Sequence, residues 1–259
     1  MKPVTSLNFL IPLGAALAMA APVAAANVVA LAGERNLVWV DTETMSVTGW
    51  VEAQGAEGQL LGIDVRPADG KLYGVFADGT VATIDPATGA STAVSMLSMK
   101  LADGVTATVD FNPVADRLRV MGSDGTSLRV NVDTGEVTQD GSHAYAQDSM
   151  MPDVIAGAYT NSFAGTEATQ LFNIDGKGGW LVLQDPPNDG MLNPVGELGF
   201  TAEWVGFDIA PDGMGGNAAW LMHAGKLYSV DLATGMASEA GMIEGAGPDL
   251  RDLAVMPAM

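Results

Sequence analysis

The sequence predicts an all-β protein with the architecture of a five-bladed β-propeller, because two short patterns alternate along it. The first pattern is a small residue followed by an apolar-Asp-apolar strand that ends near proline, as in residues 62–67. The second is a strand that runs into an Asp-to-Gly turn, as in residues 84–89. Five copies of each pattern, with no sustained helical period between them, indicate five units of about 46 residues, the size of a propeller blade.

The first pattern marks the innermost strand of each predicted blade. Its central residue is aspartate in four copies and tyrosine in the other: Asp64, Asp110, Tyr159, Asp208 and Asp252. These residues are 46, 49, 49 and 44 positions apart. The last copy lies at the C-terminus, over residues 252–256, and the other strands of its unit are expected at residues 28–51. Pairing of the N- and C-terminal strands would therefore close the ring and remove the exposed sheet edges.

The second pattern supplies the hairpin turns of the blades. Clear copies end at residues 89, 135 and 235, and looser ones cover residues 40–44 and 184–190. Asp at the first position and Gly at the last are typical of type I turns. The short runs between the patterns are apolar on both faces and are expected to be buried. A six-bladed ring built around the irregular segment 136–152, or a β-sandwich, is the alternative to five blades.

Residues 1–26 are predicted to be a signal peptide, and residues 27–259 a single propeller domain. Lys2 precedes an apolar run, and Ala24-Ala25-Ala26 gives the small-x-small pattern of a cleavage site. No second apolar run of about 20 residues follows, so no membrane span is expected after cleavage. The mature protein is expected to be a monomer in the periplasm or outside the cell.

Composition excludes several classes of function. The chain has 259 residues, 48% of them hydrophobic and only 16% charged, which argues against disorder. A formal net charge of −20 opposes binding to nucleic acid, because phosphates would be repelled. The absence of cysteine excludes thiol catalysis and disulfides. The two histidines are expected on the surface or in loops, and most of the 15 methionines and five tryptophans in the core.

Several motifs together identify a family. They are Leu61-Gly62-Ile63-Asp64-x-Arg66-Pro67, Asp110-Phe111-Asn112-Pro113, Leu128-Arg129-x-Asn131-x-Asp133-Thr134-Gly135, Ala158-Tyr159-Thr160-Asn161 and Pro186-Pro187-Asn188-x-Gly190. With them the sequence resembles the secreted bacterial family catalogued as domain of unknown function 4394, over residues 36–232. The resemblance implies export and a propeller-like fold, and it implies no catalytic residue.

Four aspartates are candidate metal ligands. Asp64, Asp110, Asp208 and Asp252 are predicted on innermost strands, where their carboxylates would face the central axis. Ca²⁺ would suit such a site, since it takes six to eight oxygen ligands. The alternative is that each aspartate accepts backbone N–H groups from the neighbouring blade and serves the fold alone. The repetition of the aspartate in several blades favours this structural alternative.

Arginines and asparagines form a second candidate site. Arg117 and Arg119 share one face of a predicted strand, Arg129 lies on the next strand of the same hairpin, and Arg66 lies one blade earlier. They would hold a carboxylate or phosphate by bidentate hydrogen bonds, together with Asn112, Asn131, Tyr159 and Asn161. The alternative is that the arginines pair between blades with Asp110, Asp116 or Asp133.

These features predict a non-catalytic exported propeller that binds a small-molecule ligand or a protein partner on a loop face. The sequence has no nucleophile elbow, phosphate-binding loop or His-Glu-x-x-His motif. The rival hypothesis is a metal-assisted hydrolase or lyase that acts at the channel mouth on a lactone, phosphoester or acidic saccharide. It would use the aspartates as metal ligands and an aspartate or Tyr159 as general acid or base. A cell-surface structural protein is a third hypothesis.

Overall fold

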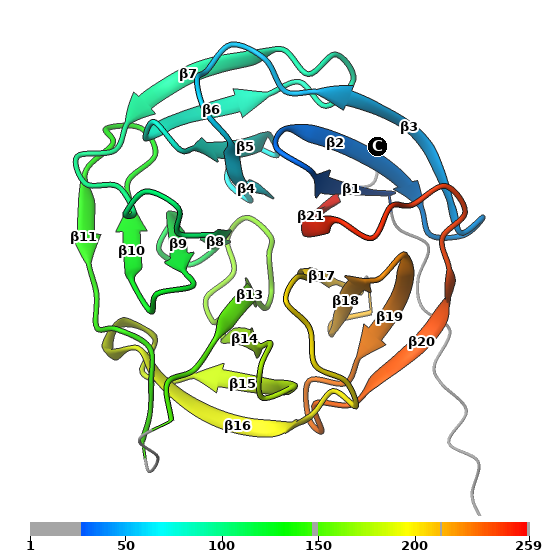
Figure 1. Cartoon of the computed structure of the whole chain (residues 1–259). Helices are drawn as coiled ribbons and strands as arrows, with labels where there is room; N and C mark the ends of the chain where they lie inside the picture. The colour runs from blue at the N-terminus through cyan, green and yellow to red at the C-terminus, as the bar shows by residue number, and fades with distance from the viewer. Residues whose placement is uncertain (1–26, 147–149, 213, 258–259) are drawn as a thin grey trace, which may run out of the picture.

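The computed structural model describes residues 27–146, 150–212 and 214–257, and these residues form a five-bladed β-propeller (Figure 1). Five sheets surround a central axis, which confirms the prediction and excludes the β-sandwich and the six-bladed ring. The predicted signal peptide at residues 1–26 lies outside the described residues. Within the described part of the chain, no helix has the length and apolar character needed to cross a membrane.

The first blade is built from both ends of the chain. Its strands, from the axis outward, are β21 (Leu250–Met256), β1 (Asn27–Ala32), β2 (Asn36–Asp41) and β3 (Ser46–Glu52). β1 and β21 pair in antiparallel fashion, with Val28 opposite Val255. The predicted closure of the ring by the two chain ends is therefore confirmed.

The other four blades run outward from the axis in chain order. The second contains β4 (Leu60–Val65), β5 (Leu72–Phe76), β6 (Thr80–Ile84) and β7 (Ser91–Met96), and the third contains β8 (Ala107–Asn112), β9 (Arg117–Gly122), β10 (Ser127–Val130) and β11 (Val137–Gln139). The fourth contains β13 (Val154–Tyr159), β14 (Leu171–Asp175), β15 (Trp180–Gln184) and β16 (Met191–Glu197), and the fifth contains β17 (Gly206–Pro211), β18 (Asn217–His223), β19 (Lys226–Val230) and β20 (Ala237–Met242). A short 3₁₀ turn, η1 (Pro187–Asp189), joins β15 to β16. The fourth blade also has a fifth strand, β12 (Ala144–Tyr145), which runs parallel to β16 and was not predicted.

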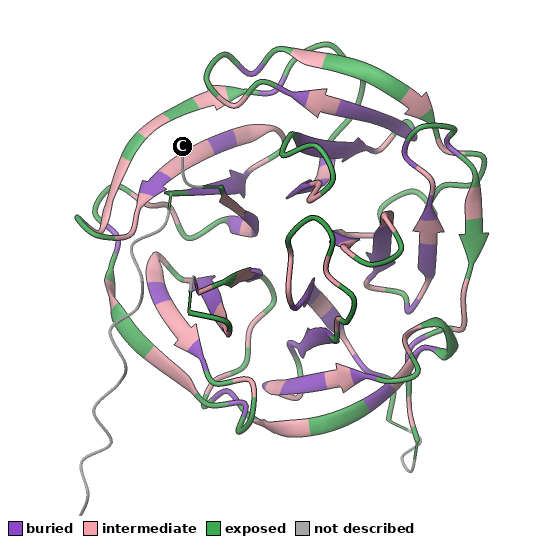
Figure 2. Cartoon of the chain, turned by 180° about the vertical axis from the view of Figure 1, so that it is seen from behind, coloured by how far each residue is buried: buried purple, intermediate pink, exposed green. Residues whose placement is uncertain are grey.

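Burial decreases from the axis outward, as Figure 2 shows. All residues of β5 are buried, whereas the outer strand β7 is half-buried or exposed along its length. The apolar side chains pack between neighbouring blades: Leu37, Ile63 and Phe76 join one cluster, and Phe172, Phe207 and Leu221 another. Because each blade buries its faces against its neighbours, the ring holds the innermost strands at fixed positions around the axis.

The glycine that ends the second sequence pattern lies where one blade meets the next. Gly89 and Gly135 both have a φ of 74°, which favours glycine. A Cβ on Gly135 would also collide with the carbonyl oxygen of Met96, at the end of the preceding blade's outer strand. In the first blade Met45 takes this place, with a φ of 53°, and its carbonyl accepts the N–H of Glu244 at 2.9 Å. The repeated turn is therefore an inter-blade contact as well as a hairpin.

Candidate functional site

Three of the four predicted aspartates come together at the axis of the ring. Asp64, Asp110 and Asp208 lie on β4, β8 and β17, and one carboxylate oxygen from each is within 4.8 Å of the others. All three side chains are buried, with at most 5% of any residue exposed. We call these three residues the Asp triad.

The Asp triad binds the innermost strands of adjacent blades. The N–H groups of the next blade donate to it, from Phe111 to Asp64 (2.7 Å), from Tyr159 to Asp110 (2.9 Å) and from Val255 to Asp208 (2.7 Å). The two remaining blades donate from Val65 to its neighbour Asp64 and from Ile209 to its neighbour Asp208, both at 2.6 Å. The three carboxylates of the triad therefore accept, between them, one backbone N–H from each of the five innermost strands.

Two residues of the first pattern lie in a different register from the one predicted. In each next blade, the residue just before the N–H donor takes the position that a triad aspartate has in its own strand, and we call this the triad position. It is Asp110 in the third blade, Ala158 in the fourth and Ala254 in the first. Tyr159 is therefore one residue beyond the triad position. Asp252 is two residues before it, and its carboxylate accepts the N–H of Ile63 at 2.9 Å. Asp252 is consequently outside the triad.

The electrostatics of the triad favour a positive charge or bound protons. Burial raises the pKa of Asp64 and of Asp110 well above the ordinary range, and the neighbouring carboxylates raise it further. Burial also raises the pKa of Asp208 to about 6, against the opposing effect of its two N–H bonds. Among the residues that the structure describes, no lysine, arginine or histidine forms an ion pair with the triad. The negative charge of these carboxylates is therefore not compensated by a side chain.

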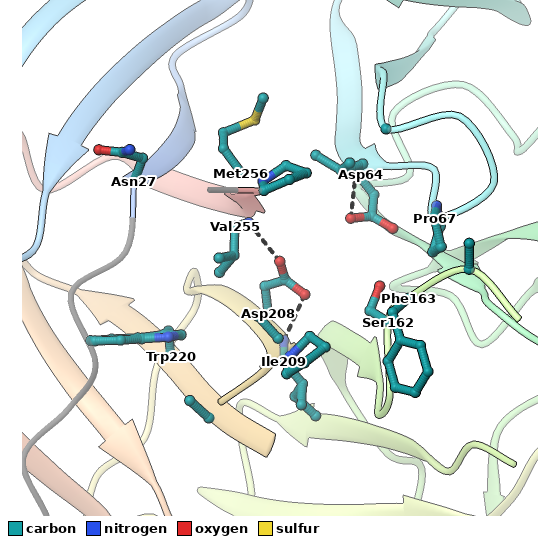
Figure 3. A pocket seen from close by; sticks show the side chains of 17 residues that line it. Asn27, Asp64, Pro67, Ser162, Phe163, Asp208, Ile209, Trp220, Val255 and Met256 are labelled. Carbon is teal, nitrogen blue, oxygen red and sulfur yellow. Dashed lines mark hydrogen bonds between the residues drawn. The ribbon is translucent and has the colours of Figure 1, made fainter. Parts of the chain in front are cut away.

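A pocket of about 550 Å³ opens above two of the triad carboxylates. Figure 3 shows the side chains of Asp64 and Asp208 pointing toward each other across it. Its walls are mainly apolar and include Pro67, Phe163, Pro211, Trp220, Met256 and Pro257. We call it the channel-mouth pocket. Its apolar walls and acidic floor suit a metal cation or an apolar ligand with a positively charged end.

Arg119 and Arg129 share a carboxylate that sequence reasoning missed. Nη1 of Arg119 donates to Asp140 at 3.1 Å, and Arg129 donates to both oxygens of Asp140 at 2.9 and 3.2 Å. Arg119 is only 1% exposed, and its remaining contacts are with Tyr159 Oη (2.7 Å), Ser127 Oγ (2.8 Å) and Asn188 Oδ1 (2.8 Å). Asp140 follows β11 directly, in a segment where the sequence gives no repeat.

The carboxylates expected to pair with arginine make no ion pair with Arg119 or Arg129. Asp116 and Asp133 form ion pairs with Arg66, at 2.6 and 2.9 Å. Asp110 belongs to the triad. The predicted pairing between blades is therefore present for Arg66, which reaches from the second blade to turns of the third, whereas Arg119 and Arg129 pair with Asp140.

The other predicted ligand-binding residues are dispersed. Arg117 donates to the backbone carbonyl of Asp116 at 2.8 Å, and Asn131 accepts the N–H of Asp133 in its own turn at 3.1 Å. The Asn161 N–H donates to Asn217 Oδ1 in the fifth blade at 2.7 Å. These contacts hold turns, and they lie apart from Arg119.

Of the residues predicted to bind a carboxylate or phosphate, Asn112 and Tyr159 line one cavity together. They line a pocket of about 390 Å³ between the third and fourth blades, together with Gln184. Burial raises the pKa of Tyr159, against the opposing effect of Arg119 and Asn112. The binding of a carboxylate or phosphate by these residues stays a prediction.

The histidines and exposed aromatic residues differ in part from expectation. His143 lies in a loop, as expected, but it is buried without a hydrogen-bond partner for either ring nitrogen among the described residues, and burial lowers its pKa to about 4. Trp50 is 66% exposed and Trp204 is 42% exposed, so neither is a core residue. Among the described residues, seven methionines are also exposed: Met96, Met99, Met150, Met151, Met214, Met236 and Met242.

Comparisons with known proteins describe a family and a fold. Residues 36–254 match the family described as "Domain of unknown function (DUF4394)". A solved structure of a protein of unknown function from Bacteroides thetaiotaomicron is 16% identical, with a TM-score of 0.52 over 73% of this chain and 51% of that chain. The chain therefore spans about half the length of that protein. At this identity the likeness concerns the fold alone.

Two further solved structures have lower scores. A protein of unknown function from Bacteroides caccae is 11% identical, with a TM-score of 0.47 over 86% of this chain and 74% of that chain. The calcium-binding protein regucalcin from Agrobacterium tumefaciens is 16% identical, with a TM-score of 0.48 over 86% and 72%. No curated protein matches the sequence.

Proposed function

We propose that this protein, which belongs to the DUF4394 family, is an exported, non-catalytic propeller that binds a positively charged ligand in the channel-mouth pocket. The observation that carries the proposal is the Asp triad, three buried carboxylates without an ion-paired side chain in the described residues. Burying uncompensated charge is costly, so a cation that neutralises the triad binds with a favourable electrostatic contribution.

The triad has acceptor capacity left for such a ligand. Each carboxylate offers about four lone-pair sites, and five N–H bonds occupy only part of the total. A calcium ion suits this set because it prefers oxygen ligands and tolerates irregular geometry, with water from the pocket completing its coordination. An organic ammonium group carries the same positive charge, and its apolar body would pack on Phe163 and Trp220. We place calcium first because all three carboxylates are within reach of one another.

Binding accounts for the site better than catalysis does. Asp64 and Asp208 are the titratable side chains among the residues that line the channel-mouth pocket, and both accept backbone N–H groups. Tyr159, which the enzyme hypothesis offers beside an aspartate as general acid or base, bonds to Arg119 and lines the smaller pocket between blades instead. A general acid or base must lie within hydrogen-bond reach of the substrate.

The test is the melting temperature of the mature protein, first in EDTA, then across titrations with calcium chloride and with phenethylammonium chloride. A ligand that binds the native state stabilises it by about 2.7 kcal/mol at a hundredfold excess over Kd. We expect a saturable rise with calcium that Asp208→Asn abolishes and Asp252→Asn, a buried carboxylate outside the triad, retains. A rise with phenethylammonium alone would assign the pocket to organic cations. Flat curves for both ions would contradict the proposed function.

A further inference from the structure

The fourth blade has a cavity that is lined in part by β12, a strand without a counterpart in the other described blades. It has a volume of about 530 Å³ and is lined by residues of β12, β14, β15 and β16, including Tyr145, Asp175, Trp180, Leu192 and Asn193. We call it the β12 pocket. The parallel strand β12, which brings Tyr145 to this blade, has no counterpart in the other four described sheets. The β12 pocket shares no lining residue with the channel-mouth pocket.

Two aromatic rings stand at fixed positions in the β12 pocket. Trp180 and Tyr145 are half-buried and pack against the cluster of Val154, Val182 and Leu192. The hydroxyl of Tyr145 donates to Asp175 Oδ2 at 2.5 Å. Asp175 is itself buried, and its other carboxylate oxygen accepts the N–H of Gly178 at 3.0 Å. The aromatic surface and the carboxylate are therefore preorganised by the fold.

The β12 pocket offers both a free donor and a free acceptor. Asn193 Nδ2 donates to the carbonyls of Leu183 (3.3 Å) and Asp185 (3.0 Å), which fixes the amide and leaves its Oδ1 without a protein donor in the described part of the chain. The indole N–H of Trp180 likewise has no acceptor among the described residues. A cation would use the acceptor alone, whereas a hydroxyl group uses both, since it donates and accepts.

We infer that the β12 pocket binds a neutral saccharide. The apolar C–H face of a sugar ring would pack on Trp180, and its hydroxyls would bond to Asn193 Oδ1, the indole N–H and the carboxylate of Asp175. Acidic saccharides are disfavoured, because the protein carries a formal net charge of −20 and the site holds a carboxylate. This binding is independent of any cation at the Asp triad.

The test is isothermal titration calorimetry of the mature protein with cellohexaose, xylohexaose, laminarihexaose and maltohexaose, in EDTA so that cation binding plays no part. We expect at least one to bind, and Trp180→Ala to abolish that binding. Trp204→Ala is the matched control, because Trp204 is an exposed tryptophan that lines a different pocket, and it should bind with unchanged affinity.

Because Trp180 also contacts the core, a second variant separates binding from folding. Asn193 is exposed, so Asn193→Ala should keep the wild-type melting temperature and weaken binding roughly threefold to tenfold, the range for one neutral hydrogen bond. Failure of all four saccharides to bind would overturn the inference, as would equal binding by Trp180→Ala and wild type. Binding of choline chloride with none of the saccharides would also overturn it and assign the pocket to cations.

Discussion

Asp64 Oδ2 accepts the backbone N–H of Phe111 at 2.7 Å, and this bond joins the innermost strand of one blade to that of the next. Asp110 and Asp208 make the same contact with their own next blades. In each case a carboxylate that belongs to one sheet accepts a backbone N–H of another. The same carboxylate oxygens therefore serve both possible roles, holding neighbouring blades together and binding a cation. Substitutions of the aspartates can separate the two roles.

Asp64→Ala should lower the free energy of unfolding by about 2–4 kcal/mol, because it leaves the N–H groups of Phe111 and Val65 buried without acceptors. Asp64→Asn keeps one acceptor oxygen and should cost less. Urea denaturation measures both changes. Asp103→Ala, at a side chain that is 95% exposed, is the control and should be close to neutral. Equal stability of Asp64→Ala and this control would contradict the structural role.

On acidification, the stabilities of two variants relative to wild type should change in opposite directions. Burial raises the pKa of Asp208 from 3.8 to about 6, so the folded state binds the proton more tightly and this group stabilises the protein as pH falls from about 7 to 4. Burial lowers the pKa of His143 from 6.5 to about 4, so this group destabilises the protein over the same range.

Asp208→Asn should therefore lose stability relative to wild type on acidification, and His143→Gln should gain it. Urea midpoints measured from pH 7 to 4 give both differences. Parallel profiles for the two variants and wild type would show that neither group titrates differently in the folded and unfolded states.

Gly135→Ala should destabilise the protein by about 2–4 kcal/mol, because the added Cβ meets the Met96 carbonyl and the backbone has a φ of 74°. Met45→Gly is the reverse substitution, at the equivalent turn of the first blade. Met45 has a φ of 53°, so the glycine variant should be about 0.5–1 kcal/mol more stable. Differential scanning calorimetry measures both, and a stabilising Gly135→Ala would refute the inter-blade role of the turn.

Arg119→Ala should lower the free energy of unfolding by about 3–5 kcal/mol, since it leaves Asp140 and Tyr159 buried with one partner fewer. Arg117→Ala is the matched control on the same strand, and it should change stability by no more than about 0.5 kcal/mol because its contact is with a turn carbonyl. Similar losses in the two variants would mean that the buried network contributes little.

The sequence was sufficient for the blades and their closure, because each blade repeats the same strand and turn chemistry. It was not sufficient for the register of the inner strands. Asp252 resembles Asp64 in its local pattern, but hydrogen bonds between blades place Ala254 at the equivalent position. Asp140 was missed for a related reason, since its role depends on Arg119 and Arg129, which only the folded ring brings beside it.

The β12 pocket shows a second limit. β12 has two residues and pairs in parallel with β16, about 47 positions later in the sequence. A strand this short leaves no periodic pattern in the local sequence from which it could be predicted. Trp50, Met96 and Met242 are a third case, because they lie on outer strands and a β-strand pattern does not tell an outer strand from an inner one. The pairing of β12 and the exposure of these side chains therefore depend on contacts between distant segments, which local sequence patterns do not reveal.

The strand nearest the axis of the first blade, β21, lies about 200 residues after the three strands outside it in the same sheet. Until residues 250–256 are available, β1 has an unpaired edge and the axis lacks one of its five walls. A chain without β21 can therefore form blades but cannot complete the ring, and it lacks the contact between Asp208 and Val255. Closure of the ring and completion of the first blade are, for this protein, a single event.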